Sequence, residues 1–86
     1  MTGIDLISQE RDEQIYKHGY TVTKDLQYKK DELIYGAYAY LTAALSGEGI
    51  HYWPFNPESF KKGDRVSCLK KAGAFIAAEL DRLLAN

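Results

Sequence analysis

A stretch from about residue 31 to residue 45 most restricts how this chain can fold, because it is apolar around most of a helical circumference. Apolar side chains recur there at helical spacing in two rows. The rows consist of Leu33, Ala37, Tyr40 and Ala44 and of Ile34, Leu41 and Leu45, and Tyr35 and Tyr38 widen the arc. A helix this apolar either lies at the centre of its domain or is covered by another subunit. The stretch therefore predicts a homo-oligomer, either a dimer or a larger assembly.

Two further stretches show helical periodicity. One covers about residues 3–18, and the other is capped by Asp64 and continues to about Ala85. Residues 47–63, which separate the second and third helices, carry no such period. We therefore predict an all-α fold: a compact three-helix bundle with a long aromatic loop between helices 2 and 3, forming a single helical domain over residues 1–86.

Composition and charge exclude several classes of protein. The chain has 45% hydrophobic and 27% charged residues, as folded globular proteins do, and its formal net charge of −1 argues against general binding to nucleic-acid backbones. Cys68 is the single cysteine, so no internal disulfide can form and a reducing compartment is the natural setting. No apolar run approaches the roughly 20 residues of a membrane span. We expect a cytoplasmic protein with neither a membrane nor a nucleic-acid partner.

The loop between the second and third predicted helices concentrates aromatic rings and cations. It reads His51-Tyr52-Trp53-Pro54-Phe55-Asn56-Pro57 and then Lys61-Lys62-Gly63-Asp64-Arg65, and Asn56-Pro57 is typical of an N-capped short turn. Rings stack on a nucleobase, while Lys and Arg neutralise phosphate, so the loop predicts a site for a nucleotide-like anion. The candidate stacking residues are Tyr52, Trp53 and Phe55, and the candidate phosphate contacts are Lys61, Lys62 and Arg65. Alternatively, the same rings plug one end of the helical core.

Arg11 falls within the apolar stripe of the first predicted helix, between Ile7 and Ile15. A lone buried charge is very costly, so this side chain either extends along the surface to solvent or meets a carboxylate. We predict an ion pair at the base of the aromatic loop, with Glu32 or Asp64 as the partner. Arg11 is also counted among the candidate ligand-binding residues.

No catalytic motif stands out, and we expect a protein that binds rather than catalyses, without a cofactor. Glu10 and Glu13 form an E-x-x-E pair, whose carboxylates share a helix face and suit Mg²⁺, although a solvated helix face explains the same pattern. All-α nucleotide pyrophosphohydrolases of the MazG type use such a pair with a second pair on a later helix. Here Asp31 and Glu32 are adjacent, so the second pair lacks its usual spacing. The alternative function is a Mg²⁺-dependent pyrophosphohydrolase that uses Glu10, Glu13 and Glu32.

Short motifs follow one another in a definite order along nearly the whole chain. They are Glu10-Arg11 with Gln14, Gly19-Tyr20-Thr21, Asp25, Glu32-Leu33, Trp53-Pro54-Phe55, Lys62 before Asp64-Arg65, and the stretch from Leu69 to Leu83. This order resembles a group of small, mostly uncharacterised proteins from phages and prophages. The resemblance implies a host-cell cytoplasm and a compact oligomer that counters host defence by capturing a nucleotide second messenger without cleaving it. A third interpretation is an interaction module with no small-molecule ligand.

Overall fold

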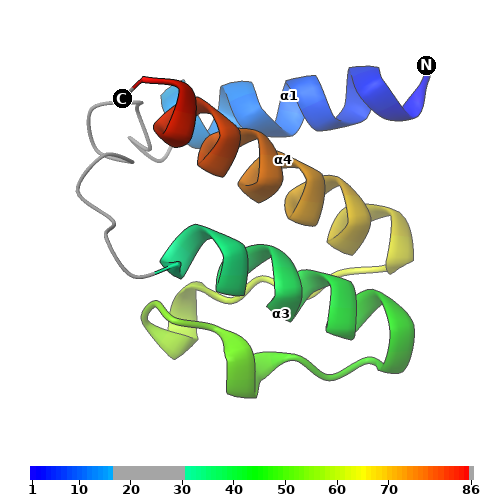
Figure 1. Cartoon of the computed structure of the whole chain (residues 1–86). Coiled ribbons are helices and arrows are strands. Elements are labelled where there is room, and N and C mark those ends of the chain that lie inside the picture. Colours follow the sequence, from blue (N-terminus) through cyan, green and yellow to red (C-terminus); the bar gives the residue numbers. More distant parts are fainter. Residues whose placement is uncertain (17–30, 86) are drawn as a thin grey trace.

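The computed structural model of the protein describes residues 1–16 and 31–85. Within these ranges the chain forms three α-helices and two short 3-10 turns (Figure 1). The helices are α1 (Gly3–Tyr16), α3 (Glu32–Ser46) and α4 (Arg65–Leu84), and the turns are η1 (Ile50–Tyr52) and η2 (Pro57–Ser59). The predicted all-α fold, with three helices and a long loop before the last of them, is confirmed.

The helix ends follow from local capping. Helix α3 ends at Ser46 and is capped by Gly47, which has a φ of 82° and donates its N–H to the carbonyl of Ala43 at 2.9 Å. Helix α4 begins after Asp64, as predicted, because the Asp64 carboxylate accepts a hydrogen bond from the Ser67 N–H at 2.8 Å. The predicted end of the first helix, at His18, lies outside the described residues, as do the Gly19-Tyr20-Thr21 motif and Asp25.

The core lies between α3 and α4, with α1 packed on the other side of α4 (Figure 1). Its buried residues are Leu33, Ala37, Tyr40, Ala43, Cys68, Ala72, Phe75 and Ala78. Small side chains let the two helices approach closely. At Gly36 an added Cβ would lie only 3.0 Å from the ring of Phe75, so this glycine makes room for the one aromatic ring of α4.

Helix α1 attaches to α4 mainly through polar side chains. Its buried residues are Glu10, Arg11 and Gln14, whereas Ile4 is exposed. Ile7 lies against Gly73 of α4, where an added Cβ would come within 2.6 Å of the Ile7 side chain. The most deeply buried side chains of α1 are therefore polar, whereas its apolar side chains Leu6, Ile7 and Ile15 are only partly buried.

The outer side of α3 and α4 carries many exposed apolar side chains. On α3 they are Ile34, Tyr35, Tyr38, Leu41 and Leu45, and on α4 they are Leu69, Ile76, Leu80 and Leu83; each is at least 42% exposed. We call this surface the α3–α4 face. Within the described ranges, no helix combines the length and the apolar character needed to cross a bilayer.

Candidate functional site

Most of the aromatic loop folds over the core. The Trp53 ring lies 5.2 Å from Tyr40 and 5.6 Å from Phe75, centroid to centroid, and 5.0 Å from the ring of Phe55. Its indole Nε1 donates to the backbone carbonyl of Asn56 at 3.0 Å and to Ser59 Oγ at 3.1 Å. The polar edge of the indole is thus satisfied within the loop, and its apolar body covers the core, as the plug interpretation describes.

The turns around Trp53 explain this position. Asn56 caps η2, because its side-chain oxygen accepts a hydrogen bond from the Glu58 N–H at 3.0 Å, as the Asn56-Pro57 pair predicted. Tyr52, the third candidate stacking residue, lies elsewhere: its exposed ring packs on Tyr38 of α3 with a centroid separation of 4.4 Å. A hydrogen bond with Tyr38 raises the pKa of Tyr52.

The three candidate phosphate contacts do not converge on one point. Lys62 Nζ donates to the carbonyl of Gly47 at 2.6 Å, and Arg65 Nε donates to the carbonyl of Ala44 at 3.2 Å. Both cations therefore satisfy carbonyls at the C-terminus of α3, where the helix dipole favours positive charge. Lys61 differs, because only its backbone N–H is engaged in the described bonding, donating to the Tyr40 hydroxyl at 2.9 Å.

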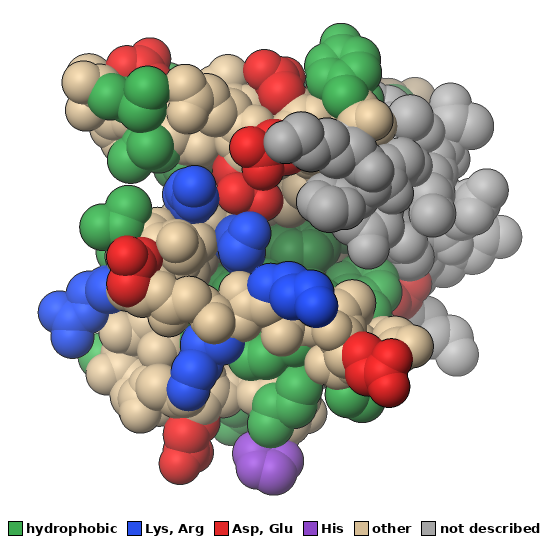
Figure 2. Space-filling model, turned by 180° about the vertical axis from the view of Figure 1, so that it is seen from behind, with side chains coloured by type: hydrophobic (Ala, Val, Ile, Leu, Met, Phe, Trp, Pro, Cys, Tyr) green, Lys and Arg blue, Asp and Glu red, His purple; other side chains and the backbone are tan. Residues whose placement is uncertain are grey.

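A small cavity lies where α1, α4 and the aromatic loop meet, and we call it the α1–loop cavity. Its volume is about 150 Å³. The polar residues that line it are Glu10, Gln14, Ser59, Lys61 and Lys71, and the rings of Tyr40, Trp53 and Phe75 supply its apolar wall. Figure 2 shows the side of the molecule opposite to that of Figure 1, where Lys and Arg side chains gather around recessed hydrophobic ones.

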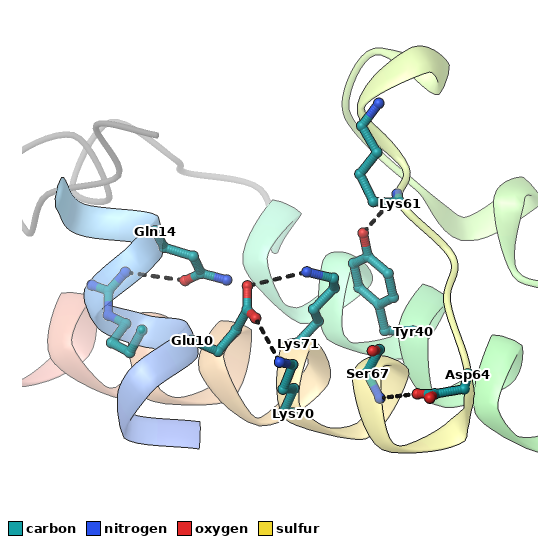
Figure 3. A network of polar contacts seen from close by, with 9 residues as sticks. Glu10, Gln14, Tyr40, Lys61, Asp64, Ser67, Lys70 and Lys71 are labelled. Carbon is teal, nitrogen blue, oxygen red and sulfur yellow. Dashed lines mark hydrogen bonds and ion pairs between the residues drawn. The ribbon is translucent and has the colours of Figure 1, made fainter. Parts of the chain in front are cut away.

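Buried polar groups of α1 define one wall of the α1–loop cavity (Figure 3). Glu10 is 4% exposed, and its carboxylate pairs with Lys71 Nζ at 3.2 Å and with Lys70 Nζ at 3.9 Å. Gln14 is also 4% exposed, and its Oε1 accepts a hydrogen bond from an Arg11 guanidinium nitrogen at 3.3 Å. A carboxylate, an amide and ammonium groups thus face an aromatic wall in a small volume.

Arg11 is buried in an ion pair, but not with a predicted partner. Its guanidinium lies 3.5 Å from the Asp81 carboxylate of α4. The predicted partner Asp64 instead caps α4 at the opposite end of that helix. The pKa of Arg82 is raised chiefly by its hydrogen bonds to Glu79, and the negative charge of the other predicted partner, Glu32, also raises it. The choice of partner was therefore wrong.

The three glutamates of the Mg²⁺ alternative have separate surroundings. Glu10 faces the lysines of the α1–loop cavity, Glu13 is on the exposed side of α1, and Glu32 lies at the start of α3. In residues 1–16 and 31–85, no three His, Cys, Asp or Glu side chains gather closely enough to hold a metal ion.

Comparisons with protein-family models, with curated proteins and with solved structures found no match. Of the residues that line the α1–loop cavity, Trp53 and Lys61 are predicted from the sequence as ligand-binding residues, whereas Gln14, Ser59 and Lys71 are not. The i, i+4 spacing of Glu10 and Gln14, which puts both on one face of α1, was the signal that could have revealed this wall of the α1–loop cavity.

Proposed function

We propose that the protein is a non-catalytic interaction module that self-associates through the α3–α4 face. The supporting observation is the set of exposed apolar side chains on both helices, which forms a continuous row on α3. On α3, Ile34, Tyr38, Leu41 and Leu45 follow one another at intervals of four, three and four residues. This is the spacing at which one helix packs along another in a left-handed bundle.

The shape of the α3–α4 face favours a helical partner. Two shallow grooves run along it, with volumes of about 450 and 400 Å³, and Leu41 borders both. Since α3 and α4 already run side by side, two copies that meet through this face form a four-helix bundle. A twofold contact of this kind uses the same surface on both copies, so it closes without leaving an apolar surface open to further association.

The charges at the two ends of the α3–α4 face favour one orientation of the two copies relative to each other. Asp31 borders one groove and Arg65 borders the other, at opposite ends of α3. A twofold axis perpendicular to the helices brings Asp31 of each copy towards Arg65 of the other. An axis along the helices brings like charges together, which is unfavourable. We therefore propose the arrangement in which opposite ends meet.

Light scattering tests this proposal, with a matched pair of variants. The parent protein is expected at twice the 9.7 kDa mass of the chain. Leu41→Lys places a charge at the junction of both grooves and is expected to return the monomer mass. Ile4→Lys introduces the same charge at a more exposed apolar position on α1, outside the α3–α4 face, and it is expected to keep the dimer. A monomeric parent at high concentration would refute the proposal.

A second candidate function is the capture of a nucleotide-like anion without cleavage, in the setting of host defence that the phage resemblance implies. The α1–loop cavity favours it, because the charged residues that line it are Lys61 and Lys71 against Glu10, whose carboxylate also lies 3.9 Å from Lys70 Nζ. Aromatic rings line the same space. A net positive charge beside ring surfaces suits a phosphorylated heterocycle.

Thermal unfolding with a panel of linear and cyclic nucleotides, each with and without Mg²⁺, tests the second candidate. Capture predicts a rise in Tm that does not depend on metal, with intact nucleotide recovered after denaturation. A nucleotide at about 100 times its Kd adds about 2.7 kcal/mol to the free energy of unfolding. Metal-dependent release of pyrophosphate would instead support the pyrophosphohydrolase alternative.

A further inference from the structure

The size of the α1–loop cavity limits what can enter it. Pockets for whole drug-sized ligands have volumes of about 300–1,000 Å³. The α1–loop cavity, at about 150 Å³, matches the volume at which a protein cavity holds one benzene ring. It therefore has room for a single six-membered ring, and a two-ring purine would extend through its open side towards solvent.

The aromatic wall of the α1–loop cavity suits a flat guest. The Trp53 indole stands at 78° to the Tyr40 ring and at 85° to the Phe75 ring, so these rings meet as the sides of a corner. A flat ring in this corner lies face to face with one wall and presents its edge to another. Both arrangements are favourable between aromatic rings.

The opposite wall offers polar groups at the edge of such a ring. Glu10 and Gln14 lie one turn apart on α1 and reach the α1–loop cavity together (Figure 3). Because Gln14 Oε1 accepts from Arg11, the amide is oriented with its NH₂ group towards Glu10 and Lys71. Glu10 retains acceptor capacity beyond its lysine contacts, since a carboxylate has about four lone-pair sites. The wall thus presents an acceptor beside a donor.

This pattern matches the edge of a pyrimidine base. In cytosine an exocyclic amino group lies next to a ring nitrogen acceptor, and in uracil a ring N–H lies next to carbonyl acceptors. Either edge donates to the Glu10 carboxylate and accepts from the Gln14 amide. The exposed side chain of Lys61, which also borders the α1–loop cavity, remains available to an attached phosphate.

We infer that the α1–loop cavity binds the base of a pyrimidine nucleotide, with the ring edge on Glu10 and Gln14 and the phosphate beside Lys61. The inference rests on the second candidate function, nucleotide capture, and specifies which class of base is held. It is independent of self-association through the α3–α4 face.

The first experiment compares cytidine monophosphate, uridine monophosphate, adenosine monophosphate, cytidine and inorganic phosphate by calorimetry and by Trp53 fluorescence. Trp53 is the single tryptophan of the chain, so its emission reports directly on the α1–loop cavity. The pyrimidine nucleotides are expected to bind and to change the emission, with cytidine weaker and phosphate alone weakest. Adenosine monophosphate binding as tightly as the pyrimidine nucleotides would overturn the inference and leave nucleotide capture standing. If none of the five compounds binds, both the inference and nucleotide capture are overturned.

The second experiment uses a matched pair of variants. Gln14→Met keeps the length and volume of the side chain but removes the amide, and it is expected to weaken cytidine monophosphate binding about tenfold. Gln9→Met makes the same exchange at an exposed position of α1 and is expected to bind like the parent. Equal affinities in folded Gln14→Met and Gln9→Met would overturn the assignment of Gln14. If Gln14→Met does not fold, the fluorescence comparison of the five ligands decides the question.

Discussion

Replacing Gly49 with alanine tests how closely the loop approaches α3. Gly49 is buried against α3 with a φ of 133°, and an added Cβ would lie 2.1 Å from the carbonyl oxygen of Ala39 and 3.2 Å from the backbone nitrogen of Ala43. Ordinary contact begins at 3.4 Å, so the loop must retreat from the helix by about 1.3 Å. This retreat displaces the segment that carries Trp53 over the core.

Two separate costs contribute to the expected destabilisation. A non-glycine residue in this backbone region costs about 1–3 kcal/mol, and forcing atoms into a packed contact costs about 1–3 kcal/mol more. We expect Gly49→Ala to lower the free energy of unfolding by about 4 kcal/mol. For a chain of this size that corresponds to a decrease in Tm of roughly 15–30 °C, measured by circular dichroism.

Two other glycines separate these costs. Gly47 also has a positive φ, 82°, but the nearest atom to an added Cβ is Lys62 Nζ at 3.9 Å, so Gly47→Ala incurs backbone strain alone and loses about 1–2 kcal/mol. Gly3 has open space around it, so Gly3→Ala is expected to show no loss. If Gly49→Ala melts within a few degrees of Gly47→Ala, Gly49 does not lie as close to α3 as described.

Three further substitutions test polar contacts. Tyr40→Phe removes the acceptor for the Lys61 N–H and is expected to cost about 1–2 kcal/mol in urea unfolding, and an unchanged midpoint would contradict that hydrogen bond. Hydrogen bonds from the first turn of α4 lower the pKa of Asp64, so its stabilising effect is present above the unfolded pKa of about 3.9 and is lost as the pH falls through the lower folded value. The difference in Tm between the parent and Asp64→Asn should therefore shrink in acid, and a difference that does not depend on pH would contradict this. Arg11→Met should cost about 1–3 kcal/mol, below the 3–5 kcal/mol of a fully buried pair, because Asp81 is half exposed and rehydrates. A double-mutant cycle with Asp81→Asn should give a positive coupling energy, and additive effects would refute the pair.

Local patterns predicted the helices well because the forces that define them act within a few residues. The 3.6-residue period located α3 and α4, and the capping side chains of Asp64 and Asn56 marked where two elements begin. Helix α4 ends at Leu84, one residue from the expected limit.

Long-range pairing was harder to predict. Arg11 and Asp81 are 70 residues apart, and nothing in the local sequence favours that carboxylate over the two that were proposed. Lys62 and Arg65 bind backbone carbonyls of α3, and backbone acceptors have no signature in a sequence. The sequence therefore predicted that Lys61, Lys62 and Arg65 form one phosphate site, whereas in the structure these three residues do not converge on one point.

The polar attachment of α1 has a consequence for how the protein opens. Because Glu10 and Arg11 must meet their partners on α4, α1 has one favourable position, yet its contact contributes little apolar burial compared with the contact between α3 and α4. Amide hydrogens of α1 should therefore exchange with solvent by a partial opening that leaves α3 and α4 together. A guest in the α1–loop cavity touches both parts, so its binding should slow exchange most in α1.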